Sequence, residues 1–162
     1  MSEASHPDPL LIKERGKRVV FLDRDGTINV DRDYVYLLEH WEWTPKAKEA
    51  LQQLQSAGYV LTVITNQTSI GHGFYTLEDM HRLNEYMRTE LEKSGVHLAA
   101  IAFCPHRKDA RCDCRKPKTG MAKQIEVKIG PIDYGSSWTI GDKDKDVGFG
   151  KTVGTKTALI RS

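Results

Sequence analysis

The chain has 162 residues, enough for one ordinary domain with a hydrophobic core and too few for two large ones. Its formal net charge of +2 carries no polyelectrolyte signal for nucleic acid, and no apolar run is long enough to cross a bilayer. The first residues are polar and lack the basic and then apolar plan of a signal peptide. We therefore expect a polar tail over residues 1–17, a single domain over residues 18–162, and a cytoplasmic monomer that binds neither nucleic acid nor membranes.

Strand and helix patterns alternate along the chain. Val19–Leu22 is a β-branched and aromatic run, which predicts a buried strand. The pattern then predicts a helix from Pro45 to Gly58, a strand over 59–65, a helix from Thr76 to Gly95, a strand over 97–103, a helix over 119–129, and strands over 138–142 and 155–160. We predict only a short or frayed helix over 144–154, because Gly148 and Gly150 each cost a helix about 1 kcal/mol relative to alanine. This alternation indicates an α/β fold with three Rossmann-like layers and a parallel sheet.

The segment Asp23-Arg24-Asp25-Gly26-Thr27 directly follows the first predicted strand. Alternate side chains of an extended segment share a face, so the two acids can converge if the strand unwinds just after Asp23. Gly26 permits the sharp backbone turn that such a loop needs. Open α/β sheets usually build their active sites at the carboxyl ends of their strands. The motif therefore indicates a site for one metal ion and one substrate.

Three further polar residues fall at or near the ends of later strands, or in the loops that follow them: Thr65, Lys116 and Asp142. A parallel sheet brings these ends to one edge, and the assembled set suits phosphoryl transfer. Asp23 would attack phosphorus and form an aspartyl-phosphate. Asp25 would protonate the leaving alkoxide and then take a proton from the hydrolytic water. Lys116 and Thr65 would hold the equatorial phosphoryl oxygens, where transition-state charge collects.

The same acids indicate a magnesium site. Mg²⁺ prefers hard oxygen ligands, and Asp23, Asp142 and the backbone carbonyl of Asp25 would supply them. The metal would offset the repulsion between an anionic nucleophile and an anionic substrate. Asp146, four residues after Asp142, is predicted to orient Lys116 or a metal-bound water.

A second cluster predicts a zinc site. Its members are Cys104, His106, Cys112 and Cys114. Three thiolates and one imidazole form a closed tetrahedral set for Zn²⁺, and no ligand position remains for a reactive water, so the site is expected to be structural. All three cysteines of the chain lie within this segment, unlike the spread of a disulfide scaffold. Arg115 and Lys116 come directly after it, so the zinc loop would fix a basic pair aimed at phosphate.

Taken in order, these motifs resemble those of the haloacid dehalogenase superfamily of phosphatases. They are Asp-x-Asp-Gly-Thr at 23–27, Thr-Asn-Gln at 65–67, Arg-Lys-Pro-Lys at 115–118 and Gly-Asp-Lys-x-x-Asp at 141–146. The cysteine and histidine loop narrows the resemblance to the capless, zinc-loop branch that contains heptose bisphosphate phosphatases and histidinol-phosphate phosphatases. The resemblance covers roughly residues 18–161. It implies a fold with no large cap domain and removal of the 7-phosphate of heptose 1,7-bisphosphate, in the synthesis of nucleotide-activated heptose.

The resemblance also implies a set of substrate contacts. They are Asp31, Arg32, Asp33, Tyr34, Asn66, Gln67, Thr68, Arg115 and Lys143. Three features depart from the usual pattern: Thr68-Ser69 replaces a small Ser-Gly pair, His72 replaces an arginine that would be a permanent cation, and the segment after Asp146 is glycine-rich rather than alanine-rich. These departures leave the catalytic set intact, and the first two lie in a loop that the resemblance assigns to the substrate.

Two other functions stay open at this point. One is hydrolysis of histidinol phosphate, which the short gap between His106 and Cys112 favours. The other is a non-catalytic module that uses the zinc loop and the basic run to bind RNA or a protein. Activity on both phosphate esters, and salt-dependent RNA binding in the absence of activity, would separate the three.

Overall fold

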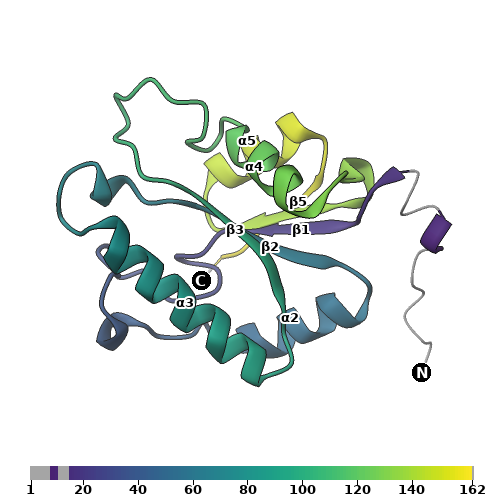
Figure 1. Ribbon diagram of the computed structural model, residues 1–162, viewed down its shortest axis with the longest axis horizontal. Coiled ribbons are helices and arrows are strands. Elements are labelled where there is room, and N and C mark those ends of the chain that lie inside the picture. The colour runs from purple at the N-terminus through teal and green to yellow at the C-terminus, as the bar shows by residue number, and fades with distance from the viewer. Residues whose placement is uncertain (1–7, 11–14, 162) are drawn as a thin grey trace.

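In the computed structural model, residues 8–10 and 15–161 are described, and five parallel strands form one sheet in the order β3-β2-β1-β4-β5 (Figure 1). The strands are β1 Val19–Leu22, β2 Val60–Asn66, β3 Leu98–Cys104, β4 Trp138–Gly141 and β5 Lys156–Leu159. Each predicted strand is therefore found within two residues of its expected bounds. Most of the predicted tail lies outside the described residues, but Lys17 at its end pairs with Ile132.

Helices cover both faces of the sheet, which confirms the three-layer prediction. The helices are α2 Ala47–Ser56, α3 Leu77–Lys93, α4 Gly120–Ile129 and α5 Asp144–Val153. In Figure 1, α2 and α3 lie on one side of the strands, and α4 and α5 lie on the other. No helix among residues 8–10 and 15–161 is both long enough and apolar enough to span a membrane.

The central strand β1 contributes to both hydrophobic cores, because its side chains alternate between the two faces. Val19 and Phe21 belong to the core that contains the apolar residues of α4 and Phe149 of α5. Val20 and Leu22 belong to the core that contains Leu51 of α2 and Met87 and Leu91 of α3. All four residues of β1 are buried, so the strand end that carries Asp23 is held from both sides.

Local hydrogen bonds and backbone angles determine where helices α2 and α3 begin. The predicted capping box of α3 is confirmed: the Thr76 backbone N–H donates to Asp79 Oδ2 at 2.9 Å, and the Asp79 N–H donates to Thr76 Oγ1 at 3.1 Å. Helix α2 begins at Ala47 rather than at Pro45, because Lys46 has a φ of 63° in the left-handed region and cannot continue a helix from proline.

The prediction of a short or frayed helix over 144–154 is wrong. Helix α5 has ten residues, and Gly150 packs closely against the sheet. A Cβ on Gly150 would lie 2.5 Å from Thr157 Cγ2 and 2.9 Å from Thr139 Cβ, so only glycine lets α5 approach the sheet this closely. Close packing against β4 and β5 therefore outweighs the intrinsic helix cost of about 1 kcal/mol per glycine.

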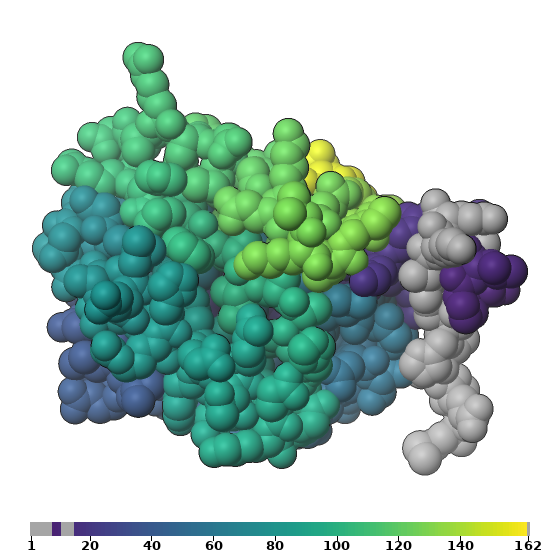
Figure 2. Space-filling model, in the orientation of Figure 1, coloured from purple at the N-terminus to yellow at the C-terminus, as the bar shows by residue number. Residues whose placement is uncertain are grey.

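The loops at the carboxyl ends of the strands pack against one another. Figure 2 shows the green segment after β3 lying beside the blue-green segment after β2 at one end of the molecule. At their contact, a Cβ on Gly71 would lie 2.9 Å from the backbone nitrogen of Arg107. The predicted zinc loop is therefore adjacent to the loop that follows Thr65 and Asn66.

Candidate active site

Asp23 stands at the end of the central strand and is almost completely buried. Its backbone N–H donates to the Ile140 carbonyl at 3.0 Å, so pairing with β4 continues one residue beyond β1. Lys116 Nζ donates to Asp23 Oδ1 at 2.8 Å. Burial raises the pKa of Asp23, and the charge of Lys116 opposes that rise. The carboxylate is thus held at a fixed place with a cation on one oxygen.

Lys116 is fully buried, and its ammonium has three acceptors. Besides Asp23, Nζ donates to Asp146 Oδ1 at 2.6 Å and to the Ile64 carbonyl at 2.9 Å. Burial lowers the pKa of Lys116, but the two carboxylates outweigh this effect and raise it above its ordinary value. The lysine is therefore a permanent and immobile cation, and Asp146 orients it as the sequence analysis expected.

Asp142 lies next to Asp23 at the end of β4. Asp23, Asp142 and Asp146 each offer an oxygen within 4.8 Å of the others. Asp142 Oδ1 is buried and has no hydrogen-bond partner within the described part of the chain. Burial raises the pKa of Asp142, and the neighbouring Asp23 adds to the rise. Two crowded carboxylates with one unpartnered oxygen form a set of hard ligands that fits Mg²⁺.

Gly26 makes room for this pair of acids. Its φ is +86°, and a Cβ at this position would lie 2.5 Å from the Asp142 carboxyl carbon. The glycine of the motif is therefore needed both for the turn and for the close approach of Asp142 to the Asp23 loop.

Asp25 is oriented by several donors. Arg24 Nη2 and Gln67 Nε2 each donate to Asp25 Oδ2 at 3.1 Å, and Asn29 Nδ2 donates to Oδ1 at 2.9 Å. Arg24 is itself fully buried, and its Nη1 donates to Asn84 Oδ1 of α3 at 2.9 Å. Asp25, the predicted general acid and base, therefore has a fixed orientation. The sequence analysis did not identify Arg24, Asn29 or Asn84, and nothing in their local pattern marks them.

The Thr-Asn-Gln segment at the end of β2 mainly positions other groups. Thr65 Oγ1 is buried and accepts a hydrogen bond from Gln67 Nε2 at 2.8 Å. Asn66 bonds the backbone of Lys116 through both atoms of its amide. Gln67 also accepts a hydrogen bond from the Tyr75 hydroxyl. The segment thus connects Asp25 and Lys116 to the end of β2.

A pocket opens above Asp23 and Asp25. Its other lining residues are Asp31, Asp33, Asn66, Gln67, Thr68, Ser69, Tyr75, Lys143 and Lys145. Lys143 Nζ lies 3.7 Å from Asp31 Oδ2 and 3.8 Å from Asp142 Oδ2. Arg115 donates to the hydroxyl of Thr68 at the rim. Most of the substrate contacts that the resemblance implies are therefore gathered around the predicted nucleophile.

Three of the implied substrate contacts, Arg32, Tyr34 and Arg115, are not among the residues that line this pocket, although Arg115 contacts Thr68 of its lining. Arg32 forms an exposed ion pair with Glu42. Tyr34 is half exposed and packs edge-on against Phe74, with ring centroids 5.1 Å apart. Between them Asp33 has a φ of 65°, and this left-handed residue redirects the loop. His72 stacks on the same Phe74 ring at 5.6 Å.

Lys145 lines the pocket but was missed by the sequence analysis. It occupies a variable position of the Gly-Asp-Lys-x-x-Asp motif, and the motif alone gives it no role. The signal that could have identified it is the start of α5 at Asp144, which places residue 145 in the first helical turn beside the active acids. Burial lowers the pKa of Lys145, and Lys116 lowers it further.

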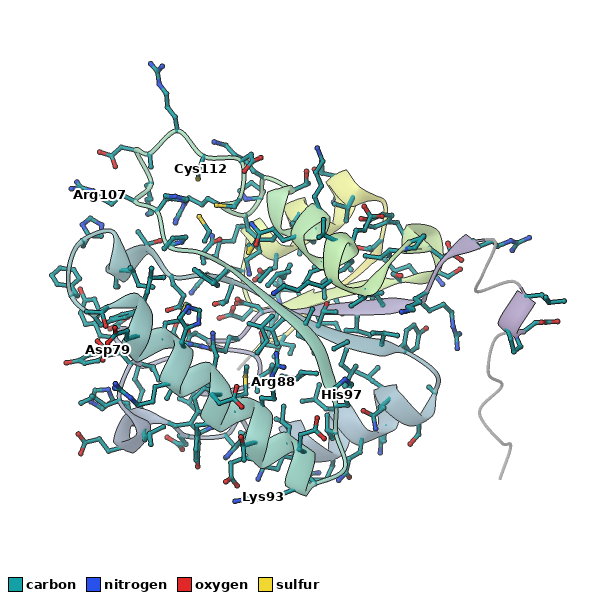
Figure 3. The ribbon with its side chains drawn as sticks, viewed as in Figure 1. Asp79, Arg88, Lys93, His97, Arg107 and Cys112 are labelled. Atoms are coloured by element: carbon teal, nitrogen blue, oxygen red, sulfur yellow. The ribbon has the colours of Figure 1, made fainter. Side chains whose placement is uncertain are left out.

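The predicted zinc ligands form a compact cluster in the loop after β3. Cys104 Sγ lies 3.8 Å from Cys112 Sγ and 3.4 Å from His106 Nδ1, which lies 3.2 Å from Cys114 Sγ. A tetrahedral zinc site with Zn–S bonds of about 2.3 Å separates its ligands by roughly 3.7 Å. The cluster therefore has the dimensions for one Zn²⁺. Figure 3 shows Cys112 on this loop, near Arg107.

The backbone around Cys112 favours a thiolate. Burial would raise the pKa of this thiol, but the backbone N–H groups of Arg115 and Cys114 donate to it and lower its pKa to about 7. A thiolate is the form of cysteine that binds a metal. Burial raises the pKa of the Cys104 and Cys114 thiols in the metal-free protein, so only Cys112 favours the thiolate there, and it is the geometry of the cluster that agrees with a zinc site.

An aspartate at the end of a central parallel strand, joined by a buried lysine and a second acid from the adjacent strand, is the arrangement of the haloacid dehalogenase-like phosphatases. The chain belongs to this class. Within it, the chain is a member of the polynucleotide kinase 3 phosphatase family, whose family model matches residues 18–147.

Individual relatives are similar over most of their length. A D-glycero-beta-D-manno-heptose-1,7-bisphosphate 7-phosphatase from Haemophilus ducreyi is 40% identical over 90% of this chain and 83% of the relative. A protein of the same name from Pasteurella multocida is 39% identical over 89% of this chain and 81% of the relative. The crystal structure of D,D-heptose 1,7-bisphosphate phosphatase from B. bronchiseptica, in complex with magnesium and phosphate, has a TM-score of 0.81 at 29% identity and covers 88% of this chain and 79% of that one.

Proposed function

We propose that the protein is a Mg²⁺-dependent phosphomonoesterase that acts through an aspartyl-phosphate on Asp23. One observation carries the proposal: a buried lysine holds one oxygen of Asp23 at 2.8 Å, and Asp142 stands beside it with an unpartnered oxygen. A nucleophile for phosphorus, a fixed cation and a pair of hard metal ligands thus occupy one point of the sheet edge.

The reaction follows from the positions of two acids. The Asp23 carboxylate attacks phosphorus, the bond from phosphorus to the ester oxygen breaks, and the leaving oxygen takes the proton of Asp25. The Asp25 carboxylate then takes a proton from water, whose oxygen attacks the phosphoryl group. This second step releases inorganic phosphate and restores both acids. The donors around Asp25 keep it oriented for both proton transfers.

Asp23, Asp142 and the backbone carbonyl of Asp25 would hold the magnesium ion. When bound, Mg²⁺ neutralises charge on the phosphoryl oxygens and on the two acids. Lys116 contributes a cation that stays in place whether or not metal is bound, since its three hydrogen bonds are made within the protein.

For the substrate we propose heptose 1,7-bisphosphate, cleaved at the primary 7-phosphate. The names of relatives at 39–40% identity support this choice. Lys143 lines the pocket and Arg115 contacts Thr68 beside it, so these two cations would supply counter-charges to the second phosphate of a bisphosphate. The product would feed the synthesis of nucleotide-activated heptose for a bacterial envelope polymer such as lipopolysaccharide.

We also propose that the cysteine and histidine cluster binds one structural Zn²⁺. Cys114 directly precedes Arg115 and Lys116 in the chain, so metal binding would hold the basic pair in register with Asp23. The expected cytoplasmic location, monomeric state and lack of nucleic-acid binding stay predictions, and gel filtration with light scattering would test the oligomeric state.

A phosphate-release assay tests the proposed function. The purified protein should hydrolyse heptose 1,7-bisphosphate with a kcat/KM well above that for histidinol phosphate, and chelation of Mg²⁺ should remove the activity. Asp23→Asn should lower kcat by about 10³-fold or more, because it removes the nucleophile. A preference for histidinol phosphate would overturn the substrate, and full activity of Asp23→Asn would overturn the mechanism.

A further inference from the structure

Lys145 is the cation of the active-site pocket that the proposed mechanism does not use. Its side chain is partly buried and lines the same pocket as Asp23 and Asp25. Within the described part of the chain it forms neither a hydrogen bond nor an ion pair. Lys116, by contrast, has three acceptors, and Lys143 lies within 4 Å of two carboxylates.

The surroundings of Lys145 are unfavourable for a positive charge. The residue lies in the first turn of α5, at the positive end of the helix dipole, where a cation is unfavourable. Burial removes part of its hydration and Lys116 repels it; the attraction of Asp23 and Asp146 does not offset these effects, so the pKa of Lys145 is lowered. The fold therefore holds a lysine where its charge does not stabilise the free protein.

The two carboxylates whose charges attract Lys145, Asp23 and Asp146, already have partners. Asp146 accepts hydrogen bonds from Lys116 Nζ at 2.6 Å and from the backbone N–H of Lys143 at 3.2 Å. Asp23 is paired with Lys116, and Asp25 is surrounded by donors. An anion that enters the pocket is the group that would supply Lys145 with a counter-charge.

We propose that Lys145 binds a phosphate oxygen of the substrate. This inference rests on the proposed phosphatase function and adds an anion-binding residue to it. Lys145 lines the pocket from the first turn of α5, and its charge interacts with those of Asp23 and Arg115. The phosphate bound by Lys145 is either the reacting phosphoryl group or the second phosphate of a bisphosphate, and the same charge interaction would serve for both.

The experiment compares Lys145→Met with Lys151→Met, which removes an exposed lysine from the last turn of the same helix. Three quantities are measured for each variant and the parent: kcat/KM on a sugar bisphosphate, kcat/KM on the corresponding monophosphate, and the Kd of inorganic phosphate in the presence of Mg²⁺. We expect a loss of about 10-fold or more in at least one of them for Lys145→Met and no change for Lys151→Met.

The pattern of losses identifies the phosphate. A similar loss on both esters, with weaker binding of inorganic phosphate, places Lys145 on the reacting phosphoryl group. A loss confined to the bisphosphate places it on the second phosphate. Three unchanged values would overturn the proposal. If the parent binds phosphate but hydrolyses no ester, the proposed function fails while the phosphate measurement still decides the role of Lys145.

Thermal unfolding separates binding from structure. Lys145→Met should not lower the melting temperature of the free protein, because it removes an unpaired and repelled cation. Lys145→Arg should recover most of the lost affinity, since it restores a cation of similar reach. A large drop in melting temperature without a change in phosphate affinity would assign Lys145 a structural role and overturn the proposal.

Discussion

Asn66 holds the backbone of Lys116 through both ends of its side-chain amide. Its Oδ1 accepts from the Lys116 N–H at 3.0 Å, and its Nδ2 donates to the Lys116 carbonyl at 3.3 Å. The end of β2 is thereby tied to the segment that follows the cysteine cluster. Two sets of contacts therefore hold the Lys116 ammonium close to Asp23: the bonds from Asn66 to the Lys116 backbone and the hydrogen bonds of the ammonium itself.

Replacement of this amide should affect both stability and turnover. Asn66→Ala removes two hydrogen bonds and leaves a partly buried N–H unpaired, so we expect a loss of about 1–3 kcal/mol in the free energy of unfolding. Misplacement of Lys116 should lower kcat by about 10-fold or more. Gln52→Ala is a suitable control, because Gln52 also bonds a backbone carbonyl, that of Ser94, on an exposed surface. Equal kcat values for Asn66→Ala and the control would contradict this role.

Gly26 can be tested against another glycine with the same backbone requirement. Gly26 and Gly95 both have φ in the left-handed region, at +86° and +74°. Alanine at either position should cost about 1–2 kcal/mol of stability. Only at residue 26 would the added Cβ collide with Asp142, since nothing lies within 4 Å of a Cβ at residue 95. We expect Gly26→Ala to lose activity and magnesium affinity, and Gly95→Ala to keep both; comparable activities would show that the close approach to Asp142 is unimportant.

The raised pKa of Asp142 predicts a pH dependence for the metal-free protein. A carboxyl whose pKa is raised by folding binds more protons in the folded state, so its contribution to stability falls as the pH rises from the ordinary pKa through the raised one. Asp142→Asn should therefore melt higher than the parent at neutral pH by about 2–4 °C for each kcal/mol gained, and the difference should vanish in acid. Added Mg²⁺ should raise the melting temperature of the parent alone. An equal response to Mg²⁺ in the variant would remove Asp142 from the metal site.

Loss of one thiolate should release the proposed zinc ion. We expect about one mole of Zn²⁺ per chain in the parent and little in Cys112→Ser, with a melting temperature lower by about 5–10 °C. Asp113→Asn changes the adjacent residue without removing a ligand and serves as the control. Metal analysis and thermal unfolding provide the readouts, and unchanged stability after complete removal of zinc would count against a structural role.

The parts of the fold that the sequence analysis predicted depend on patterns that are local. The apolar run of β1, the stripe of α3 and its Thr76 capping box each act within one element, and the structure has them as expected. The full length of α5 was missed because Gly150 acts through contact with Thr139 and Thr157, which lie elsewhere in the chain. Propensity alone contains no information about such packing.

In the candidate site, too, some features could be predicted from the sequence, and others depend on contacts between distant segments. The predicted meeting of Asp23, Lys116 and Asp142 followed from the rule that parallel strands share an edge. The bond from Arg24 to Asn84 joins residues sixty positions apart and depends on how α3 sits against the loop. The direction of the Asp31–Tyr34 loop depends on a left-handed residue, Asp33, that could not be foreseen from an aspartate.

Because the strands are parallel, the candidate active site lies at their carboxyl ends, and the amino ends of the strands lie at the opposite end of the molecule. Figure 3 shows Lys93 and His97 far from the loop that carries Cys112. Lys93 closes α3 with an exposed ammonium, and β3 begins only a few residues later, at the amino edge of the sheet. This end offers attachment points for fluorophores, immobilisation or fusion, because a label there would leave diffusion into the pocket unobstructed.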